Sequence, residues 1–252
     1  MNREEFRKEG ERIDSLQRDG YDIIQHPGKF CFGMDAVLLS SFVTAKMGET
    51  VLDFCTGTGV IPILLKAKTE GSHFTGLELQ PDVADMAQRS VAMNGLEGDI
   101  DIICGDLKNA EAYFAPASFD VITCNPPYMI AGDGLVNPED TLALSRHEVG
   151  CTLDDVLAAT KKCLKAGGRF YMVHRPFRLA EILKKMSDTG LEPKAMRMVY
   201  PYVDREPNMV LIEGRRGAKS GMKIASPLII MQSDGTYTKE VADLYNSCGE
   251  RK

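Results

Sequence analysis

Two kinds of hydrophobic pattern alternate along the chain. Short apolar runs, which are typical of buried strands, are separated by longer segments whose apolar residues recur at helical spacing. The runs span residues 51–54, 73–78, 100–106, 119–124, 169–174, 194–201 and 208–213. The helical segments span residues 60–68, 83–94, 152–164 and 175–186. This alternation predicts an α/β fold with a mostly parallel, seven-stranded sheet, helices on both faces and a terminal antiparallel hairpin.

The first 48 residues are more polar and less regular. Residues 3–19 are rich in charge, with a few apolar residues at loose helical spacing, which predicts a short exposed helix or an arm. Residues 21–26 predict a strand that ends in a Pro-Gly turn. Asp35 precedes the apolar run at 36–43, so we expect it to be the N-cap of a helix.

The strand at 51–54 runs into a loop with two glycines. Gly57 and Gly59 allow backbone angles and close approaches that a Cβ would block, and a helix follows directly, as in nucleotide sites at the edge of a parallel sheet. A dinucleotide site would need a third glycine or alanine where the chain has Pro62. Asp53 would repel a pyrophosphate but attract a cationic or hydroxyl-bearing group. The loop therefore favours S-adenosylmethionine, with a plain strand-to-helix turn as the alternative.

Acidic residues stand at the exits of three successive strands. They are Asp53, Glu78 and Asp106. In doubly wound nucleotide folds, an acid at the position of Glu78 binds the ribose hydroxyls. Asp106 suits an adenine amino group or the cap of the next helix. Each acid alone is consistent with an ordinary loop or cap residue, but the three together predict a cofactor site.

The fourth strand runs directly into Asn125-Pro126-Pro127-Tyr128. The two prolines lack N–H donors and stiffen the backbone, which presents the preceding carbonyls outward. Asn125 adds a carboxamide oxygen, and Tyr128 adds a flat aromatic face. Together these groups can accept both hydrogens of an –NH2 group and stack on the attached plane, so we predict catalytic residues here rather than a plain proline turn. Residues 129–150 predict an insertion loop over this site.

Composition narrows the class of protein. The 252 residues contain no apolar run long enough to span a bilayer, and the polar N-terminus is unlike a signal peptide, so we expect a cytoplasmic protein with no membrane partner. The chain has seven cysteines, none in a CxxC pair and none with a histidine at metal-ligand spacing. We therefore expect reduced thiols and no metal site.

Charge is distributed unevenly along the chain. Residues 1–160 hold 12 lysines and arginines against 26 acidic residues, whereas residues 161–223 hold 15 against 6. The basic segment predicts one face that binds phosphates, with ordinary solvated helix faces as the alternative.

With these residues in view, the chain resembles the class I S-adenosylmethionine-dependent methyltransferases. Its segment 125–128 is similar to the catalytic motif of amino-group methyltransferases. Further segments resemble the bacterial tRNA1(Val) adenine-N6 methyltransferase family, namely Phe32-Gly-Met-Asp35-Ala-Val-Leu-Leu, Arg146-His147-Glu148, Val173-His174-Arg175-Pro176, Asn208-Met-Val-Leu-Ile-Glu-Gly-Arg215 and Pro227-Leu-Ile-Ile. This resemblance covers nearly the whole chain. It implies N6-methylation of the adenosine 3′ of the anticodon, with S-adenosylmethionine as cofactor and the tRNA anticodon loop as partner.

The resemblance and the residue patterns together assign roles within the expected site. The expected catalytic residues are Asn125, Pro126, Pro127 and Tyr128. The expected cofactor-binding residues are Asp53, Cys55, Thr56, Gly57, Gly59, Glu78, Asp106 and Asn125. The expected substrate-binding residues are Phe32, Asp35, Arg146, His147, Arg175, Arg178, Arg215, Arg216 and Lys219.

The sequence departs from the methyltransferase pattern at Cys55, where the usual loop has glycine. Because cysteine is small and Gly57 and Gly59 remain, we expect the loop to tolerate it. We expect residues 1–48 to form a substrate-side extension of a cofactor-binding domain at 49–252.

Two other functions are consistent with the same residues. A glutamine carboxamide suits the same acceptors as an adenine amino group, so protein glutamine N5-methylation is one alternative. A non-catalytic nucleotide-binding or RNA-binding module is the other. The sequence leaves the oligomeric state open.

Overall fold

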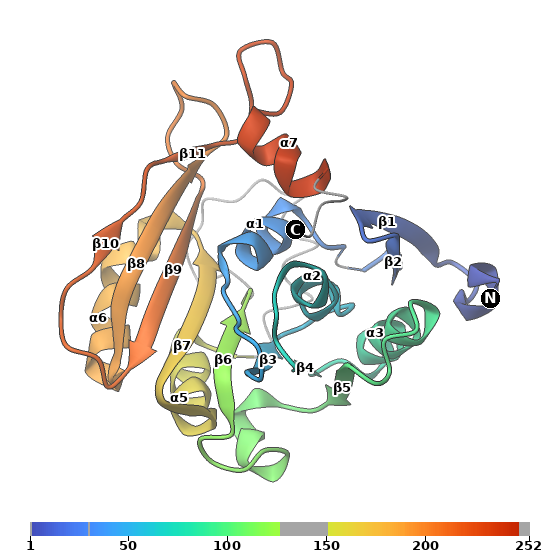
Figure 1. Cartoon of the computed structure of the whole chain (residues 1–252), viewed down its shortest axis with the longest axis horizontal. Coiled ribbons are helices and arrows are strands. Elements are labelled where there is room, and N and C mark those ends of the chain that lie inside the picture. The colour runs from blue at the N-terminus through green and yellow to red at the C-terminus, as the bar shows by residue number, and fades with distance from the viewer. Residues whose placement is uncertain (1, 30, 127–150, 247–252) are drawn as a thin grey trace.

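A mixed sheet of nine strands crosses the part of the chain that the computed structural model describes, residues 2–29, 31–126 and 151–246 (Figure 1). Its strands are β3 Thr50–Phe54, β4 His73–Glu78, β5 Ile100–Cys104, β6 Phe119–Cys124, β7 Leu164–His174, β8 Leu191–Tyr200, β9 Met209–Arg216, β10 Lys223–Ile224 and β11 Leu228–Ile229. The seven longer strands lie in the order β8-β9-β7-β6-β3-β4-β5, and β10 and β11 pair with β8 at the edge. Only β9 is antiparallel to its neighbours among these paired strands. The predicted fold class is confirmed.

Helices cover both faces of the sheet. They are α1 Met34–Phe42, α2 Val60–Lys68, α3 Pro81–Met93, α5 Leu153–Cys163, α6 Leu179–Thr189 and α7 Lys239–Asn246. Successive strand residues point to opposite faces. Val51 therefore packs with α1 and α2, whereas Leu52 and Phe54 pack with α5 and α6. This two-sided burial explains why the central strands are almost wholly apolar.

The predicted helix at 152–164 is confirmed as α5, and its N-terminus shows why it begins there. The hydroxyl of Thr152 accepts the backbone N–H of Asp155, and the Asp155 carboxylate accepts the backbone N–H of Thr152 in return. This capping box satisfies donors that the first helical turn leaves open. Lys161 and Lys162 lie in the last turn, where the helix dipole favours positive charge.

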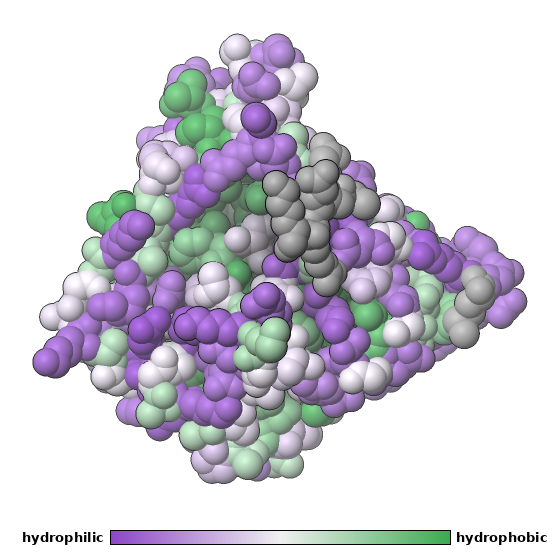
Figure 2. Space-filling model, in the orientation of Figure 1, coloured by the Kyte–Doolittle hydropathy of each residue, from purple (hydrophilic) through white to green (hydrophobic). Residues whose placement is uncertain are grey.

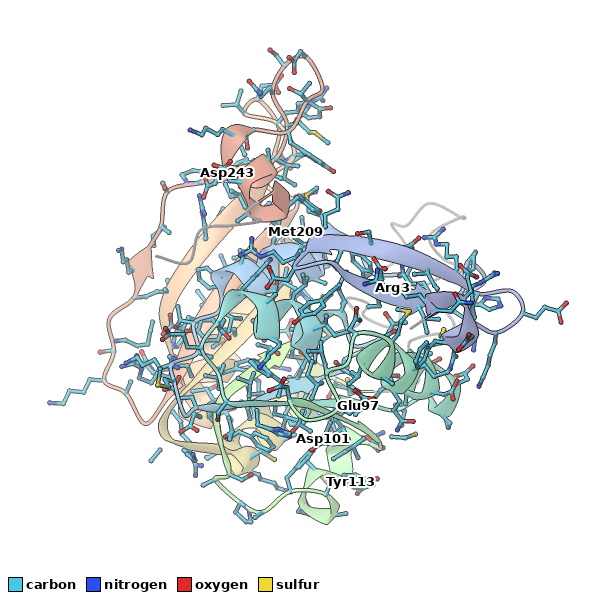
Figure 3. The ribbon with its side chains drawn as sticks, turned by 45° about the vertical axis from the view of Figure 1, so that its right-hand side comes forward. Arg3, Glu97, Asp101, Tyr113, Met209 and Asp243 are labelled. Carbon is cyan, nitrogen blue, oxygen red and sulfur yellow. The ribbon has the colours of Figure 1, made fainter. Side chains whose placement is uncertain are left out.

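The N-terminal segment differs from the prediction. Residues 3–19 contain the short helix η1 Arg3–Phe6, but their second half forms the strand β1 Arg12–Arg18, which pairs with β2 Tyr21–Gln25. Arg3 forms an ion pair with Asp22 of β2, and it lies beside this hairpin in Figure 3. The hairpin is held on α3 because the backbone of β2 donates to Ser90 and Asn94. Pairing with β2, rather than a local apolar pattern, therefore determines the strand.

The later part of the sheet also differs in its boundaries. β7 begins at Leu164, earlier than predicted, because Leu164 already pairs with Phe119 of β6, and an irregularity before Arg169 accommodates two glycines. β9 extends to Arg216, beyond the predicted end at residue 213, so Arg215 and Arg216 belong to the strand.

Polar residues cover most of the face seen in Figure 2, and apolar residues form small patches among them. Among the described residues, no helix is both long and apolar enough to cross a membrane.

Candidate functional site

The candidate site lies where the carboxyl ends of β3, β4, β6 and β7 meet. Asp53 of β3 is level with Gly76 of β4 and Thr123 of β6, so the loop after β3 lies between the ends of its two neighbours. In a parallel sheet, loops at this edge bind ligands, particularly where the chain connection reverses direction. The register thus brings together side chains from distant parts of the sequence.

The Asp53 carboxylate is buried in the middle of this edge, with 1% of the residue exposed. Its Oδ1 accepts the hydroxyl of Thr123 at 2.6 Å, and its Oδ2 has no hydrogen-bond partner among the described residues. Burial raises the pKa of Asp53 to about 7, although the hydrogen bond from Thr123 opposes this shift. A buried carboxylate with an open oxygen is suited to a ligand that brings a cationic or hydrogen-bond-donating group.

The loop that follows Asp53 has three residues in the left-handed conformation. Cys55 has φ +56°, Gly57 has φ +58° and Gly59 has φ +86°. A Cβ on Gly59 would lie 3.2 Å from the Cβ of Ala87 on α3, so glycine permits the helix to approach here. The positive φ explains why glycine is usual at the position of Cys55. The departure carries a conformational cost of about 1–2 kcal/mol.

Glu78 connects this loop to the end of β4. Its Oε2 accepts the backbone N–H of Gly57 at 2.9 Å, and its Oε1 accepts that of Gln80 at 3.0 Å. A carboxylate oxygen has two lone-pair directions, so Glu78 can still accept a hydroxyl from a ligand.

The other acid predicted for the cofactor, Asp106, caps the short helix η2 Leu107–Ala112. Its side chain accepts the backbone N–H of Lys108 at 2.9 Å. Of the two roles that the sequence left open for Asp106, helix capping is the one the structure contains. Its contact with adenine stays a prediction.

Three thiols gather beneath the loop. The Sγ atoms of Cys55 and Cys151 are 3.8 Å apart. A hydrogen bond with the Cys124 thiol raises the pKa of Cys55, and burial raises that of Cys124. Protonated thiols are poor nucleophiles, so this cluster does not suggest thiol catalysis. The cysteines in the described residues are free.

Asn125 follows β6 directly and lies beside α1. Its Nδ2 donates to Oδ2 of Asp35 at 3.1 Å, and the next residue, Pro126, is buried. Four residues predicted for the site lie outside the described residues: Pro127, Tyr128, Arg146 and His147. The predicted insertion loop at 129–150 lies outside them as well.

The prediction that Asp35 is an N-cap is wrong. Gly33 is the N-cap of α1, without a side-chain hydrogen bond, and Asp35 lies within the first turn, where its Oδ1 accepts the N–H of Ala36 at 2.9 Å. The helix begins earlier than predicted, and this places the Asp35 carboxylate against Asn125. Phe32 precedes the helix, partly buried against the core, and its N–H donates to Gln25.

The predicted basic residues do not form one face. Arg175 and the helix η3 Pro176–Arg178 follow β7 at the candidate-site edge. Arg178 there is held by two hydrogen bonds to Glu181, at 2.9 and 2.8 Å. Arg215, by contrast, pairs with Arg169 in the middle of β7, and Lys219 follows the end of β9.

The antiparallel direction of β9 causes this separation. From the His174–Val210 pair to the Arg169–Arg215 pair, the two strands advance about 17 Å. Arg216 lies at the same distant edge, where its guanidinium donates to the carbonyl of Leu164. The expectation of one basic face is therefore corrected to two separate groups.

His174 is a site residue that was not predicted. It ends β7, is 1% exposed, and its Nδ1 accepts the N–H of Arg175 at 2.8 Å. Burial lowers its pKa to about 4, so the imidazole is neutral at physiological pH. The sequence contained one indication of this residue, namely its position at the end of a predicted strand. That strand end lies beside the end of β6.

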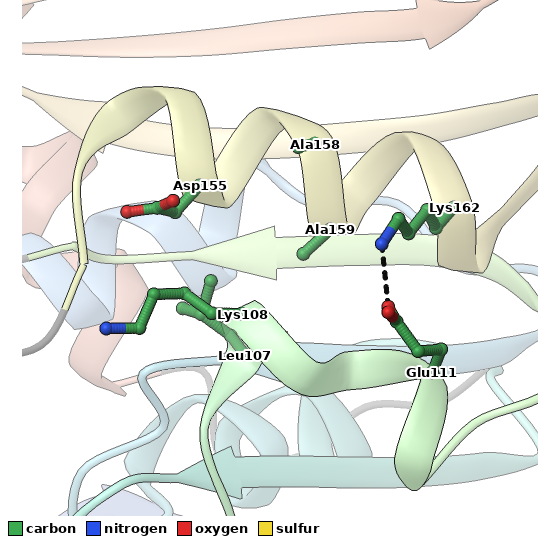
Figure 4. Close-up of a pocket in the computed structure, with 7 residues that line it drawn as sticks. All are labelled: Leu107, Lys108, Glu111, Asp155, Ala158, Ala159 and Lys162. Atoms are coloured by element: carbon green, nitrogen blue, oxygen red, sulfur yellow. Dashed lines mark hydrogen bonds and ion pairs between the residues drawn. The ribbon is translucent and has the colours of Figure 1, made fainter.

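A small hollow lies between η2 and α5, next to Asp106 at the start of η2 (Figure 4). Its lining residues are Leu107, Lys108, Glu111, Asp155, Ala158, Ala159 and Lys162. Lys162 and Glu111 form an ion pair across it at 2.7 Å. None of the predicted site residues lines this hollow.

Comparison with known proteins gives a consistent family. Residues 20–189 match the family model described as "Methyltransferase small domain". The tRNA1(Val) (adenine(37)-N6)-methyltransferase of Aeromonas hydrophila is 27% identical over 213 residues, which cover 84% of this chain and 87% of that protein. The enzyme of the same description from Porphyromonas gingivalis is 25% identical over 232 residues, covering 89% and 90%.

Solved structures show the same fold. A predicted O-methyltransferase from Agrobacterium tumefaciens superposes with a TM-score of 0.69 at 20% identity, covering 84% of this chain and 96% of that one. Geranyl diphosphate C-methyltransferase from Streptomyces coelicolor, solved with S-adenosyl-L-homocysteine, gives a TM-score of 0.53 at 16% identity, covering 73% and 78%. At these identities, the likeness establishes the fold alone.

Proposed function

Since the chain belongs to the methyltransferase small domain family and is an S-adenosylmethionine-dependent methyltransferase, we propose that it methylates N6 of an adenosine in tRNA, the one 3′ of the anticodon. The observation that carries this proposal is the position of Asn125 and Pro126 at the same sheet edge as Asp53 and Glu78. Amide and backbone oxygens there suit an amino group as methyl acceptor. The two relatives described above are named for this reaction, which supports adenine and tRNA as the substrate.

The residues present fit the cofactor. The open oxygen of buried Asp53 suits the ammonium of the methionine part. The N–H groups of Thr56, Gly57 and Gly59 are bonded within the chain, so the loop contributes a close approach of the backbone at the start of α2. Glu78 is placed for the ribose hydroxyls. We assign Asp106 to the adenine. S-adenosylmethionine, when bound, supplies an electrophilic methyl group on its sulfonium.

The chain's own residues then act mainly by positioning. We propose that the Asn125 Oδ1 and the Pro126 carbonyl accept the two hydrogens of the adenine N6 amino group. The nitrogen lone pair is delocalised into the ring, so acceptors that draw the amino group toward tetrahedral geometry, and stabilise the charge that develops on it, lower the barrier. Tyr128 would stack on the base. No general base is required, because the proton can leave after the transfer.

Features near the same edge support an RNA substrate. The ring of Phe177 in η3 is 72% exposed, and Arg175 precedes it at the end of β7. Exposed aromatic rings beside arginines bind unstacked bases and phosphates of single-stranded RNA. An anticodon-loop nucleotide can be turned out of its stack at small cost, which the chemistry requires.

The N-terminal residues complete the proposed arrangement. We propose that residues 1–48 form the substrate-side extension of the domain at 49–252. This assignment is supported by α1, which carries Asp35 to Asn125.

Mass spectrometry of tRNA nucleosides tests the proposed function. tRNA from a strain that lacks the gene should lose N6-methyladenosine at the position 3′ of the anticodon, and the gene should restore it. The Asn125→Ala variant, as a matched control, should not. If the modification is unchanged and a protein glutamine loses its methyl group instead, the substrate proposed here is wrong.

A further inference from the structure

The carboxamide of Asn125 bonds to a carboxylate from another part of the chain. Nδ2 of Asn125 donates to Oδ2 of Asp35 at 3.1 Å, although 90 positions separate the two residues. A carboxamide has a donor end and an acceptor end, and the two are hard to distinguish by shape alone. The partner therefore decides which way the group points.

Asp35 can act only as the acceptor in this hydrogen bond. An ionised carboxylate accepts hydrogen bonds and donates none. It must therefore face the NH2 end of Asn125, which turns Oδ1 of Asn125 away from α1.

The position of Asp35 on α1 is itself well determined. Its other oxygen, Oδ1, accepts the N–H of Ala36 at 2.9 Å. The N-cap, Gly33, forms no side-chain hydrogen bond, so the positive end of the helix dipole is available to the Asp35 carboxylate. These interactions hold the carboxylate in place.

We propose that Asp35 is a positioning residue that orients the Asn125 carboxamide so that its carbonyl oxygen faces the acceptor amino group. The inference rests on the proposed function for the identity of that acceptor. The bond to a carboxylate also polarises the amide and makes Oδ1 a stronger acceptor. Without Asp35, the carboxamide can rotate and present its own NH2 to the target nitrogen, where it would oppose the transfer. Asp35 thus acts through Asn125 and was predicted instead to contact the substrate.

A double-mutant cycle in single-turnover methylation separates this role from a structural one. Asp35→Ala should slow methyl transfer about 10-fold, with the affinities for cofactor and tRNA within about 3-fold of the original. Asp35→Asn retains an oxygen that can accept from Nδ2, so it should recover most of the rate. In an Asn125→Ala background, Asp35→Ala should cause no further loss. If the two substitutions slow methyl transfer independently, so that their fold-losses multiply in the double variant, the proposal is wrong.

Asp82 offers a matched control. It is an acidic residue in the first turn of α3 and pairs with Lys29. Asp82→Ala removes a helix-terminal charge of the same kind without touching Asn125, so it should lower thermal stability as Asp35→Ala does but leave the rate unchanged. A rate loss as large as that of Asp35→Ala would show a general stability effect and contradict the proposal.

A second measurement is independent of any substrate. In 15N-labelled protein, the side-chain amide signal of Asn125, assigned by its loss in Asn125→Ala, should shift in Asp35→Ala and stay in place in Asp82→Ala. An unmoved signal in Asp35→Ala would overturn the inference. If the wild-type protein does not methylate tRNA, the proposed function fails, and the amide signal still decides whether Asp35 orients Asn125.

Discussion

The backbone N–H of Gly57 donates to the Glu78 carboxylate at 2.9 Å and so ties the glycine loop after β3 to the end of β4. The hydrogen bond holds the loop at the edge of the sheet. It also fixes the carboxylate that we assign to the ribose. One hydrogen bond thus holds both the glycine loop and the carboxylate that we assign to the ribose.

Replacement of Glu78 should therefore weaken cofactor binding more than it slows saturated turnover. Glu78→Ala leaves the ribose hydroxyls and the Gly57 N–H without this partner, a loss of about 1–3 kcal/mol in binding free energy. Calorimetric titration with S-adenosyl-L-homocysteine measures it. Glu97→Ala, at the exposed residue labelled in Figure 3, is the control and should bind normally. Equal affinities for the two variants would contradict the ribose assignment.

The buried carboxylate of Asp53 should make stability depend on pH. Burial raises its folded-state pKa to about 7, above the unfolded value. The folded protein therefore binds more protons than the unfolded chain between about pH 4 and pH 7, so the free energy of unfolding should fall as the pH rises through this window. The upper limit is about 1.4 kcal/mol per pH unit.

Urea unfolding of the cofactor-free protein at several pH values tests this expectation. Asp53→Asn keeps the shape but cannot ionise, so its stability should change less between pH 4 and pH 7 and exceed that of the original protein at pH 7.5. Parallel curves for the two proteins across this range would show that Asp53 titrates normally.

tRNA should contact the candidate-site edge and not the opposite edge. If Arg175 meets a phosphate, Arg175→Ala should reduce the slope of log affinity against log salt by about 1. Arg215→Ala removes the same charge about 17 Å away along the sheet, so it should leave the slope unchanged. Filter binding across a salt series measures both slopes. If Arg215→Ala reduces the slope and Arg175→Ala leaves it unchanged, the RNA binds at the opposite edge instead.

The exposed ring of Phe177 gives a separate test of RNA docking. Phe177→Ala should weaken tRNA binding by about 1–3 kcal/mol if the ring stacks on a base, whereas Phe177→Tyr keeps the ring and should bind normally. Cofactor affinity should change in neither variant. Normal tRNA binding by Phe177→Ala would remove this ring from the interface.

Local hydrophobic patterns were enough to predict most strands of the sheet, because its central strands are buried on both faces and must be apolar. The same logic failed for β1, whose residues are largely polar and become a strand only by pairing with β2. Contacts between distant residues were also hidden. The bond between Asp35 and Asn125 depends on how α1 packs on β7 and β9, and a local sequence pattern contains no information about that packing.

The direction of β9 shows a second limit. The hairpin of β8 and β9 was predicted, but the basic residues of the last third of the chain were assigned to one face by charge alone. Because β9 runs opposite to β7, residues near its end lie at the far edge of the sheet. Net charge along a segment does not specify where the chain places it.

Methyl transfer by Asn125→Ala under single-turnover conditions tests the central claim most directly. With tRNA and S-adenosylmethionine in excess of their dissociation constants, the wild-type protein should form N6-methyladenosine, and the variant should form it about 100-fold more slowly because one preorganised acceptor is lost. Its affinities for both ligands should be nearly unchanged, since the contribution arises in the transition state. N6-methyladenosine formed at the wild-type rate by Asn125→Ala would contradict the account.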